Sequence, residues 1–122
     1  RRAALAEGEI DIERVPRDAF VTLSHRYMLW AVDEEKRIAD RVSAGQAAIP
    51  RTHEGMLEQR ALQRDTVVLM VRAVRGLTVG EVDSESVSGE DLARLIEDAG
   101  LLGDVAERAR KAQSPTPQQL ER

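Results

Sequence analysis

Cysteine is absent from the sequence, and aromatic residues are scarce. Without cysteine the chain has no disulfide scaffold, no thiolate metal site and no cysteine nucleophile. The three aromatic residues are Phe20, Tyr27 and Trp30. Leucine, valine, isoleucine and alanine must therefore supply most of the hydrophobic core.

Long apolar runs are also missing. No run approaches the roughly 20 residues that a helix needs to cross a bilayer, and Arg1-Arg2 is not followed by the apolar core of a signal peptide. We therefore expect a soluble, cytoplasmic protein without a membrane partner. Because the chain begins with arginine rather than methionine, we expect it to be a fragment or a trimmed form of a longer protein.

Charge of one sign is not concentrated anywhere in the sequence. The 22 acidic and 18 basic residues are mixed along the chain and give a net charge of −4. Binding to a nucleic-acid backbone needs clustered positive charge, so nucleic acid is not an expected partner. At 122 residues the chain has the size of one domain. We predict a single helical domain over residues 1–113 and a proline-containing tail over residues 114–122.

The most apolar segment, residues 55–75, is predicted to form the central helix. It begins with an amphipathic pattern and is almost wholly apolar over residues 67–74, which predicts neighbours on several sides. Thr66 and the two valines after it are β-branched and also suit a strand, but the helix-forming flanks and the length of the segment favour a helix. Thr52 is the predicted N-cap, and Gly76 is the predicted end.

A second long helix is predicted before it, from Pro16–Asp18 to Gly45. Apolar residues recur at steps of three and four, and in the first half they cover so wide an arc that we expect burial on two sides there. The acidic run Asp33–Glu35 could instead cap a new helix, so a break near Val32 is an open alternative. The segment Glu9–Glu13 alternates polar and apolar residues, which predicts a short extended segment.

Two shorter helices are predicted in the C-terminal part. Residues 77–87 contain glycine and serine with few apolar residues, which favours a loop or a small hairpin. Ser88 is the predicted side-chain cap of a helix that ends at Gly100. A last helix is predicted from residue 103 or 104; its apolar residues continue to Ala112, and it ends in the segment that begins at Ser114. The predicted fold class is all-α, or mainly helical, with four or five helices.

His25 and His53 are the side chains that titrate nearest to neutral pH. His25 has no acid or second histidine one turn further along its helix, where Leu29 stands, so we expect a partly buried structural histidine. His53 follows the predicted cap residue and is expected at a surface helix terminus. Neither histidine belongs to a metal-binding pair.

Carboxylates recur on the two long helices at spacings that a metal-dependent hydrolase could use. Basic residues among them form ordinary ion pairs within one helix, however, and Ala39 stands where a repeated acid would be needed. We therefore predict a solvated face, with no catalytic residue, no metal ion and no cofactor. The acids concerned are Asp33, Glu34, Glu35, Asp40, Glu54 and Glu58.

The two C-terminal helices and the glycine-containing turn between them invite comparison with a helix-turn-helix motif. In this alternative, the protein is a small regulatory or nucleic-acid-binding module, and Arg108, Arg110 and Lys111 face the nucleic acid. Acidic residues such as Glu90 and Asp104 surround them. The electrostatic footprint of such a module is therefore missing.

Four large side chains on adjacent turns of the first long helix form the candidate interaction site: Phe20, Tyr27, Met28 and Trp30. They could be core residues, because a chain with few aromatic residues tends to bury them, or a docking face for another protein. A contact with a second copy of the chain on the same face is a further alternative. We predict a non-enzymatic assembly or adaptor protein that binds a protein partner, or itself as a homo-oligomer, through apolar helix faces.

Residues 65–111 resemble the C-terminal half of the small tail assembly chaperones of long-tailed bacteriophages. The resemblance is carried by a β-branched helix end leading into Val74–Leu77, by an acidic turn with Val82-Asp83, and by the segment Ser88–Leu92 with the apolar residues after it. It covers less than half of the chain, and the family commonly has tryptophan where this chain has Leu77. The resemblance implies an all-helical, phage-encoded protein that binds a structural protein during assembly, catalyses no reaction, and is found in the host cytoplasm or the virion.

Overall fold

The computed structural model describes residues 4–114, and the chain divides into two compact units. The hairpin unit comprises Arg17–Leu62, and the sheet unit comprises the described residues of Arg1–Pro16 and Gln63–Arg122. Within residues 4–114 there are four α-helices and two two-stranded sheets, so the protein is mainly helical and the predicted all-α class holds only approximately. The single domain over residues 1–113 stays a prediction. Except for Ser114, the predicted tail lies outside the described residues.

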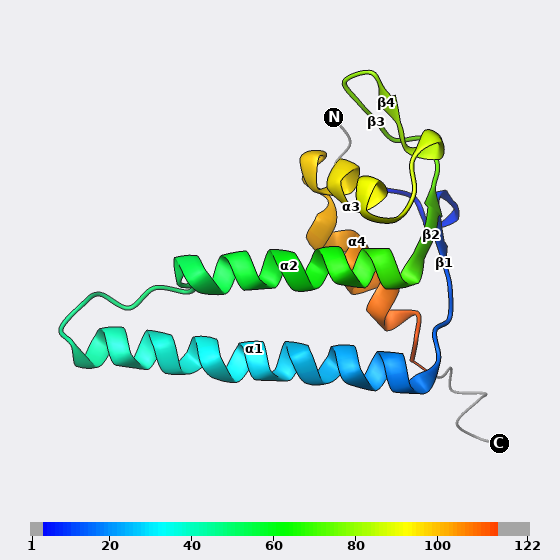
Figure 1. Ribbon diagram of the computed structural model, residues 1–122. Helices are drawn as coiled ribbons and strands as arrows, with labels where there is room; N and C mark the ends of the chain where they lie inside the picture. Colours follow the sequence, from blue (N-terminus) through cyan, green and yellow to red (C-terminus); the bar gives the residue numbers. More distant parts are fainter. Residues whose placement is uncertain (1–3, 115–122) are drawn as a thin grey trace. The chain divides into compact units, whose positions relative to one another are not determined.

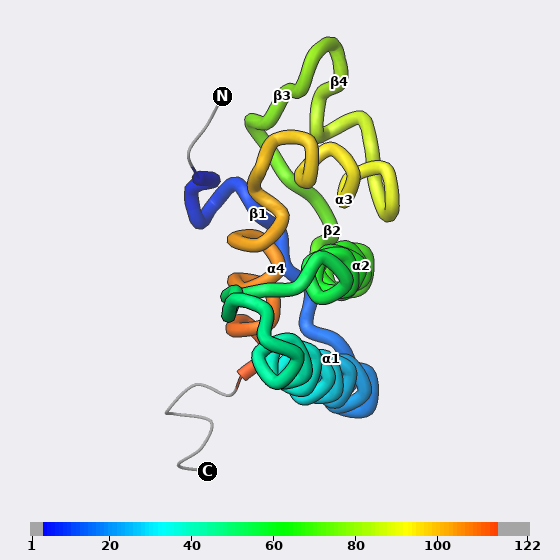
Figure 2. The backbone as a smooth tube through the Cα atoms, turned by 90° about the vertical axis from the view of Figure 1, so that its left-hand side faces the viewer, coloured from blue at the N-terminus to red at the C-terminus, as the bar shows by residue number. Residues whose placement is uncertain are grey.

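The hairpin unit consists of α1 (Arg17–Ser43), a loop, and the first part of α2 (His53–Met70). α1 is one continuous helix, which confirms the predicted long helix and excludes the break near Val32. It begins directly after Pro16, whose fixed φ suits a helix start, and it ends shortly before Gly45, which has a φ of 82°. Figures 1 and 2 show α1 and the N-terminal part of α2 as two antiparallel helices lying side by side.

The predicted central helix over residues 55–75 is wrong at its C-terminal end. α2 ends at Met70, and Val71–Val74 continue directly as strand β2. β2 pairs antiparallel with β1 (Ile10–Ile12), the short extended segment that the alternating sequence predicts. β-branched valines suit a strand when a partner strand is present. Here the partner lies near the N-terminus of the chain, where no local pattern around β2 could indicate it.

The core of the sheet unit is aliphatic, because all three aromatic residues of the chain lie in the hairpin unit. Thr66 and Val67 lie in α2, as predicted, and both are fully buried. The expectation of a core built mainly from aliphatic residues is therefore confirmed for this unit. The other large, fully buried hydrophobic side chains are Met70, Val74, Leu92, Ile96 and Val105.

Residues 77–87 form a small hairpin, which is one of the two forms predicted for them. β3 (Thr78–Val79) and β4 (Val82–Asp83) pair antiparallel. Gly80 lies in the turn with a φ of 61°, a backbone conformation that glycine adopts without strain. The one-turn 3-10 helix η2 (Ser84–Ser86) follows β4.

A buried serine joins the base of this hairpin to the end of β2. The Ser84 hydroxyl donates a hydrogen bond to the Val74 carbonyl at 2.7 Å and accepts one from the Leu77 amide at 3.4 Å. The Ser84 amide also donates to the Leu77 carbonyl at 2.8 Å. One small polar side chain thus satisfies backbone groups that the turn leaves without strand partners.

The last two helices of the sheet unit are α3 (Gly89–Asp98) and α4 (Leu102–Lys111). The predicted side-chain cap of α3 is wrong: within the described chain the Ser88 hydroxyl makes no capping hydrogen bond, and its carbonyl accepts from the Leu92 amide at 3.3 Å. Gly89 has a φ of 57°. The chain therefore turns at the glycine as it enters the helix, and this turn takes the serine side chain away from the first amides.

Candidate interaction surface

Two stripes of side chains run along different sides of α1. Steps of three and four residues keep each stripe on one side, because an α-helix has 3.6 residues per turn. The inner stripe is buried or half-buried and consists of Phe20, Leu23, Tyr27, Trp30, Glu34, Arg37 and Arg41. The outer stripe is exposed at every position and consists of Val21, His25, Met28, Val32, Glu35, Ala39 and Val42.

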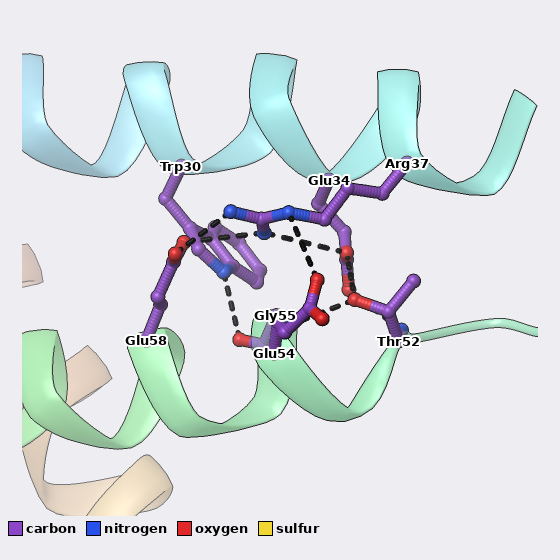
Figure 3. A network of polar contacts seen from close by, with 7 residues as sticks. All are labelled: Trp30, Glu34, Arg37, Thr52, Glu54, Gly55 and Glu58. Carbon is purple, nitrogen blue, oxygen red and sulfur yellow. Dashed lines mark hydrogen bonds and ion pairs between the residues drawn. The ribbon is translucent and has the colours of Figure 1, made fainter. Parts of the chain in front are cut away.

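The polar part of the inner stripe binds the N-terminus of α2 (Figure 3). Glu34 is only 2% exposed, and its carboxylate accepts hydrogen bonds from the Thr52 amide at 2.9 Å and from the Thr52 hydroxyl at 2.5 Å. The same hydroxyl accepts from the Gly55 amide at 3.0 Å, so Thr52 is the N-cap of α2, as predicted. A carboxylate at this end also interacts favourably with the helix dipole.

The environment of Glu34 keeps it ionised. Burial by itself would raise the pKa of Glu34, because it disfavours the charged form. The hydrogen bonds from Thr52 act in the opposite direction, as do the positive charges of Arg37 and Arg51, and together they hold the pKa of Glu34 below its ordinary value. Glu34 is therefore a charged structural residue that joins α1 to α2.

Gly55 leaves the space that the Glu34 carboxylate occupies. A Cβ atom at position 55 would overlap both carboxylate oxygens, so only glycine fits this close approach. In the same turn, Trp30 Nε1 donates to the Gly55 carbonyl at 2.8 Å, and the Arg51 guanidinium lies 4.8 Å from the centre of the indole ring. The sequence analysis did not predict the close approach of Glu34 and Trp30 to Gly55. The one local signal for it is a glycine in the first turn after the cap residue.

Arg37 forms ion pairs with three of the acids that were considered as metal ligands. Its guanidinium pairs with Glu58 through two hydrogen bonds of 3.2 and 2.7 Å, and it lies 3.7 Å from both Glu34 and Glu54. The hydrogen bond to Glu58 raises the pKa of Arg37 above its ordinary value. The prediction of a solvated face is wrong for Glu34, which is buried. It holds for three acids that are exposed on α1: Asp33, Glu35 and Asp40.

The structure does not bring the four predicted interaction residues together. Phe20, Tyr27 and Trp30 lie on the inner stripe and are half-buried, whereas Met28 lies on the outer stripe and is 54% exposed. A step of two residues turns a side chain by roughly 200° around a helix, so Met28 and Trp30 point to opposite sides of α1. The role of all four residues in partner binding stays a prediction.

The outer side of α1, meaning the outer stripe with the adjoining Leu29, is largely apolar and uncovered. Val21, Leu29 and Val32 are 52%, 48% and 57% exposed. The prediction that this half of the helix is buried on two sides is wrong, because the hairpin unit supplies no second layer over these exposed side chains. The prediction of a partly buried His25 is wrong for the same reason, since His25 is exposed on this side. His53 is exposed at the start of α2, as predicted.

The three basic residues of the alternative nucleic-acid site lie on α4, and each is engaged within the chain. Arg108 donates to the Leu5 carbonyl at 2.6 Å and pairs with Asp104 at 3.3 Å. Lys111 pairs at 3.1 Å with an acid one turn earlier, and Arg110 is half-buried with an interaction of its own. Nucleic-acid binding through these residues stays a prediction.

A hollow of about 430 Å³ lies where α1 ends and α2 begins. Its wall carries both signs of charge, with Arg37 and Arg41 beside Asp40 and Glu54. Within the described residues, the buried Nε of Arg41 makes no hydrogen bond. Because the charges of the wall are mixed, they select no ligand of one sign, and the exposed apolar side of α1 is the stronger candidate site.

The fold and this surface define a mainly helical protein in which one long helix presents an uncovered apolar side. Nowhere in residues 4–114 is there a helix with the length and hydrophobicity that crossing a membrane requires. The same residues hold no group of three or more side chains suited to a metal ion. No model of a known protein family matches the sequence, and comparisons with curated proteins and with solved structures give no match either.

Proposed function

We propose that the protein is a non-enzymatic assembly or adaptor protein that binds a protein partner, or a second copy of itself, through the outer side of α1. The observation that carries this proposal is the exposure of Val21, Met28, Leu29 and Val32 on consecutive turns of one helix. Single exposed apolar residues are normal on a protein surface, whereas adjoining ones mark interaction sites.

Covering these four side chains would stabilise a complex. Full burial of a valine, leucine or methionine side chain contributes about 1.5–3 kcal/mol, and each of these is roughly half exposed, so their joint contribution is on the order of 3–6 kcal/mol. Association must also overcome the loss of translational and rotational freedom. The four residues can therefore supply the centre of an interface, and polar contacts around them supply specificity.

Where the partner is not a second copy, we propose that it is a structural protein, in line with the resemblance of residues 65–111 to phage tail assembly chaperones. Such a protein would act without a cofactor or a catalytic residue, in the host cytoplasm or in the virion. Of the residues predicted for partner binding, Met28 lies on the proposed surface. Phe20, Tyr27 and Trp30 would contribute only where a partner also reaches the inner stripe.

A photo-crosslinking amino acid placed at Met28 or Val32 of the full chain, in cells of its native source, tests the proposal. Leu57 is the matched control position, because it is 51% exposed but lies on α2. We expect positions 28 and 32 to give protein adducts of defined mass that position 57 does not give. Equal labelling from all three positions, or no adduct from 28 and 32, would overturn the proposal.

A further inference from the structure

The outer stripe has the spacing of a coiled-coil seam. From Val21 to Val42 its members follow one another at alternating steps of four and three residues, which is the heptad repeat with which two helices pack side by side. Every member is exposed. The 27 residues of α1 span about 40 Å at 1.5 Å per residue, and a second helix of the same length would cover the stripe from end to end.

Six of the seven members of the outer stripe, from Val21 to Ala39, are also placed symmetrically about position 30. Two polar residues, His25 and Glu35, stand five residues before and after this position, and two apolar residues, Met28 and Val32, stand two residues before and after it. Antiparallel helices related by a two-fold axis place residues at equal distances from the axis opposite one another. The order of residues in the stripe is therefore suited to pairing with itself.

We infer that the outer stripe binds a second copy of this chain, with the two α1 helices antiparallel about a two-fold axis level with position 30. The inference rests on the proposed function, because both require the outer side of α1 to bind protein. The inference adds that the bound protein is a second copy of this chain. The facing pairs between the two copies are His25 with Glu35, Met28 with Val32, and Val21 with Ala39, and at the ends of the helices Val42 faces Asp18.

The polar pair selects this arrangement among the alternatives. In a parallel pair each residue faces its own copy, so Glu35 would meet Glu35. An antiparallel pair shifted by one heptad places Glu35 opposite Val32 or Asp18, where it meets an apolar side chain or another acid. Pairing about position 30 instead brings the carboxylate beside the imidazole of His25, which can donate a hydrogen bond to it. Single polar residues in a seam commonly fix register in this way.

Leu29 fits the same arrangement. Residues that flank a coiled-coil seam are often charged, yet this flanking leucine is 48% exposed. It stands one residue from position 30, so the Leu29 side chains of the two copies would meet across the axis. The pairing therefore covers the large apolar side chain that lies outside the stripe on this side of α1.

The mass of the purified full chain, measured by light scattering over a range of concentrations, tests the inference. We expect a dimer that dissociates on dilution; a monomer at every concentration would overturn it. His25→Glu sets a new carboxylate against Glu35 twice in the dimer, and it should raise the dissociation constant about tenfold or more. Adding Glu35→Lys restores opposite charges in the antiparallel pair alone, so dimerisation should return. Absence of this rescue would overturn the proposed orientation.

Exposed positions on the two helices provide a matched comparison. Met28→Lys should abolish the dimer, and Leu57→Lys on α2 should leave it unchanged, with circular dichroism showing the wild-type helix content for both. An equal effect of the two substitutions would overturn the inference. If the purified chain is monomeric but still crosslinks from Met28 to another protein in cells, the proposed function stands and the inference of a second copy is overturned. Absence of any adduct from Met28 and Val32 would remove both.

Discussion

The carboxylate of Glu34 occupies the space in which a β-carbon at Gly55 would stand. The two residues belong to α1 and α2, so this close approach of the two helices depends on a missing side chain in one and a buried charge in the other. Thr52 holds the carboxylate with two hydrogen bonds and also caps α2. The first turn of α2 therefore fixes both where that helix starts and how it contacts α1.

Gly55→Ala is expected to destabilise the protein by about 1–3 kcal/mol, as overpacking does, although the same change in an open helix stabilises by up to about 1 kcal/mol. Gly103→Ala in α4 is the control. The nearest atom to its added Cβ is Gln63 Nε2 at 3.4 Å, so a gain in stability is expected there. Urea unfolding measures both variants. Equal gains at the two positions would mean that Glu34 does not fill the space beside Gly55.

The stabilisation that Glu34 contributes to the folded protein should be lost in acid. The pKa of Glu34 in the folded protein lies below the ordinary value of 4.5, so the unfolded chain takes up the proton first as the pH falls. The stabilisation is complete above pH 4.5 and is lost as the pH falls through the folded-state pKa. In urea unfolding, the difference in stability between wild type and Glu34→Gln should therefore narrow toward low pH. A difference that stays constant as the pH falls would count against the assignment.

Trp30→Phe removes the indole N–H that donates to the Gly55 carbonyl, and it is expected to lower the free energy of unfolding by about 1 kcal/mol. Trp30→Ala, which also removes the ring, should lower it further. Circular dichroism is the measurement, because Trp30 is the only tryptophan of the chain and fluorescence is lost with it. A Trp30→Ala variant with wild-type stability and lost partner binding would instead place Trp30 in a docking face.

Ser84→Ala is expected to lower the free energy of unfolding by about 1–2 kcal/mol, because the buried Val74 carbonyl and Leu77 amide each lose a hydrogen-bond partner. Ser86→Ala is the control on the same turn. Its hydroxyl donates to the Asp83 carbonyl at an exposed position, where water can replace it, so the effect should stay within about 0.5 kcal/mol. Similar losses in chemical denaturation would show that burial of Ser84 contributes nothing.

The helices could be predicted because their signals are local. Pro16 and Gly45 mark the limits of α1, and the apolar steps between them indicate a helix without reference to the rest of the chain. β2 could not be predicted in this way. Val71–Val74 have the composition of a buried helix end, and they form a strand because Ile10–Ile12 lie beside them, which no local window contains.

The candidate surface was predicted only in part, for a related reason. Spacing assigned Glu34 to ion pairs within its own helix, whereas its hydrogen bonds reach Thr52 on the other side of the loop. The scarcity of aromatic residues favours Trp30 as an interaction residue, although the exposed outer side of α1 contains none of the three aromatic residues. The wide apolar arc that includes Val21 and Val32 was the useful signal. A sequence shows that such an arc needs a neighbour, but not whether the same molecule provides it.

The order of the two units along the chain has a consequence for how the protein forms. The hairpin unit is one continuous segment inserted into the sheet unit, so β1 is synthesised well before β2. Pairing the two strands must close a loop that contains the whole hairpin, and loop closure costs more conformational entropy as the number of unstructured residues grows. A hairpin that has already formed shortens that loop. We therefore expect the nascent chain to form α1 and the start of α2 first, and to leave Ile10–Ile12 unpaired until Val71–Val74 have been added.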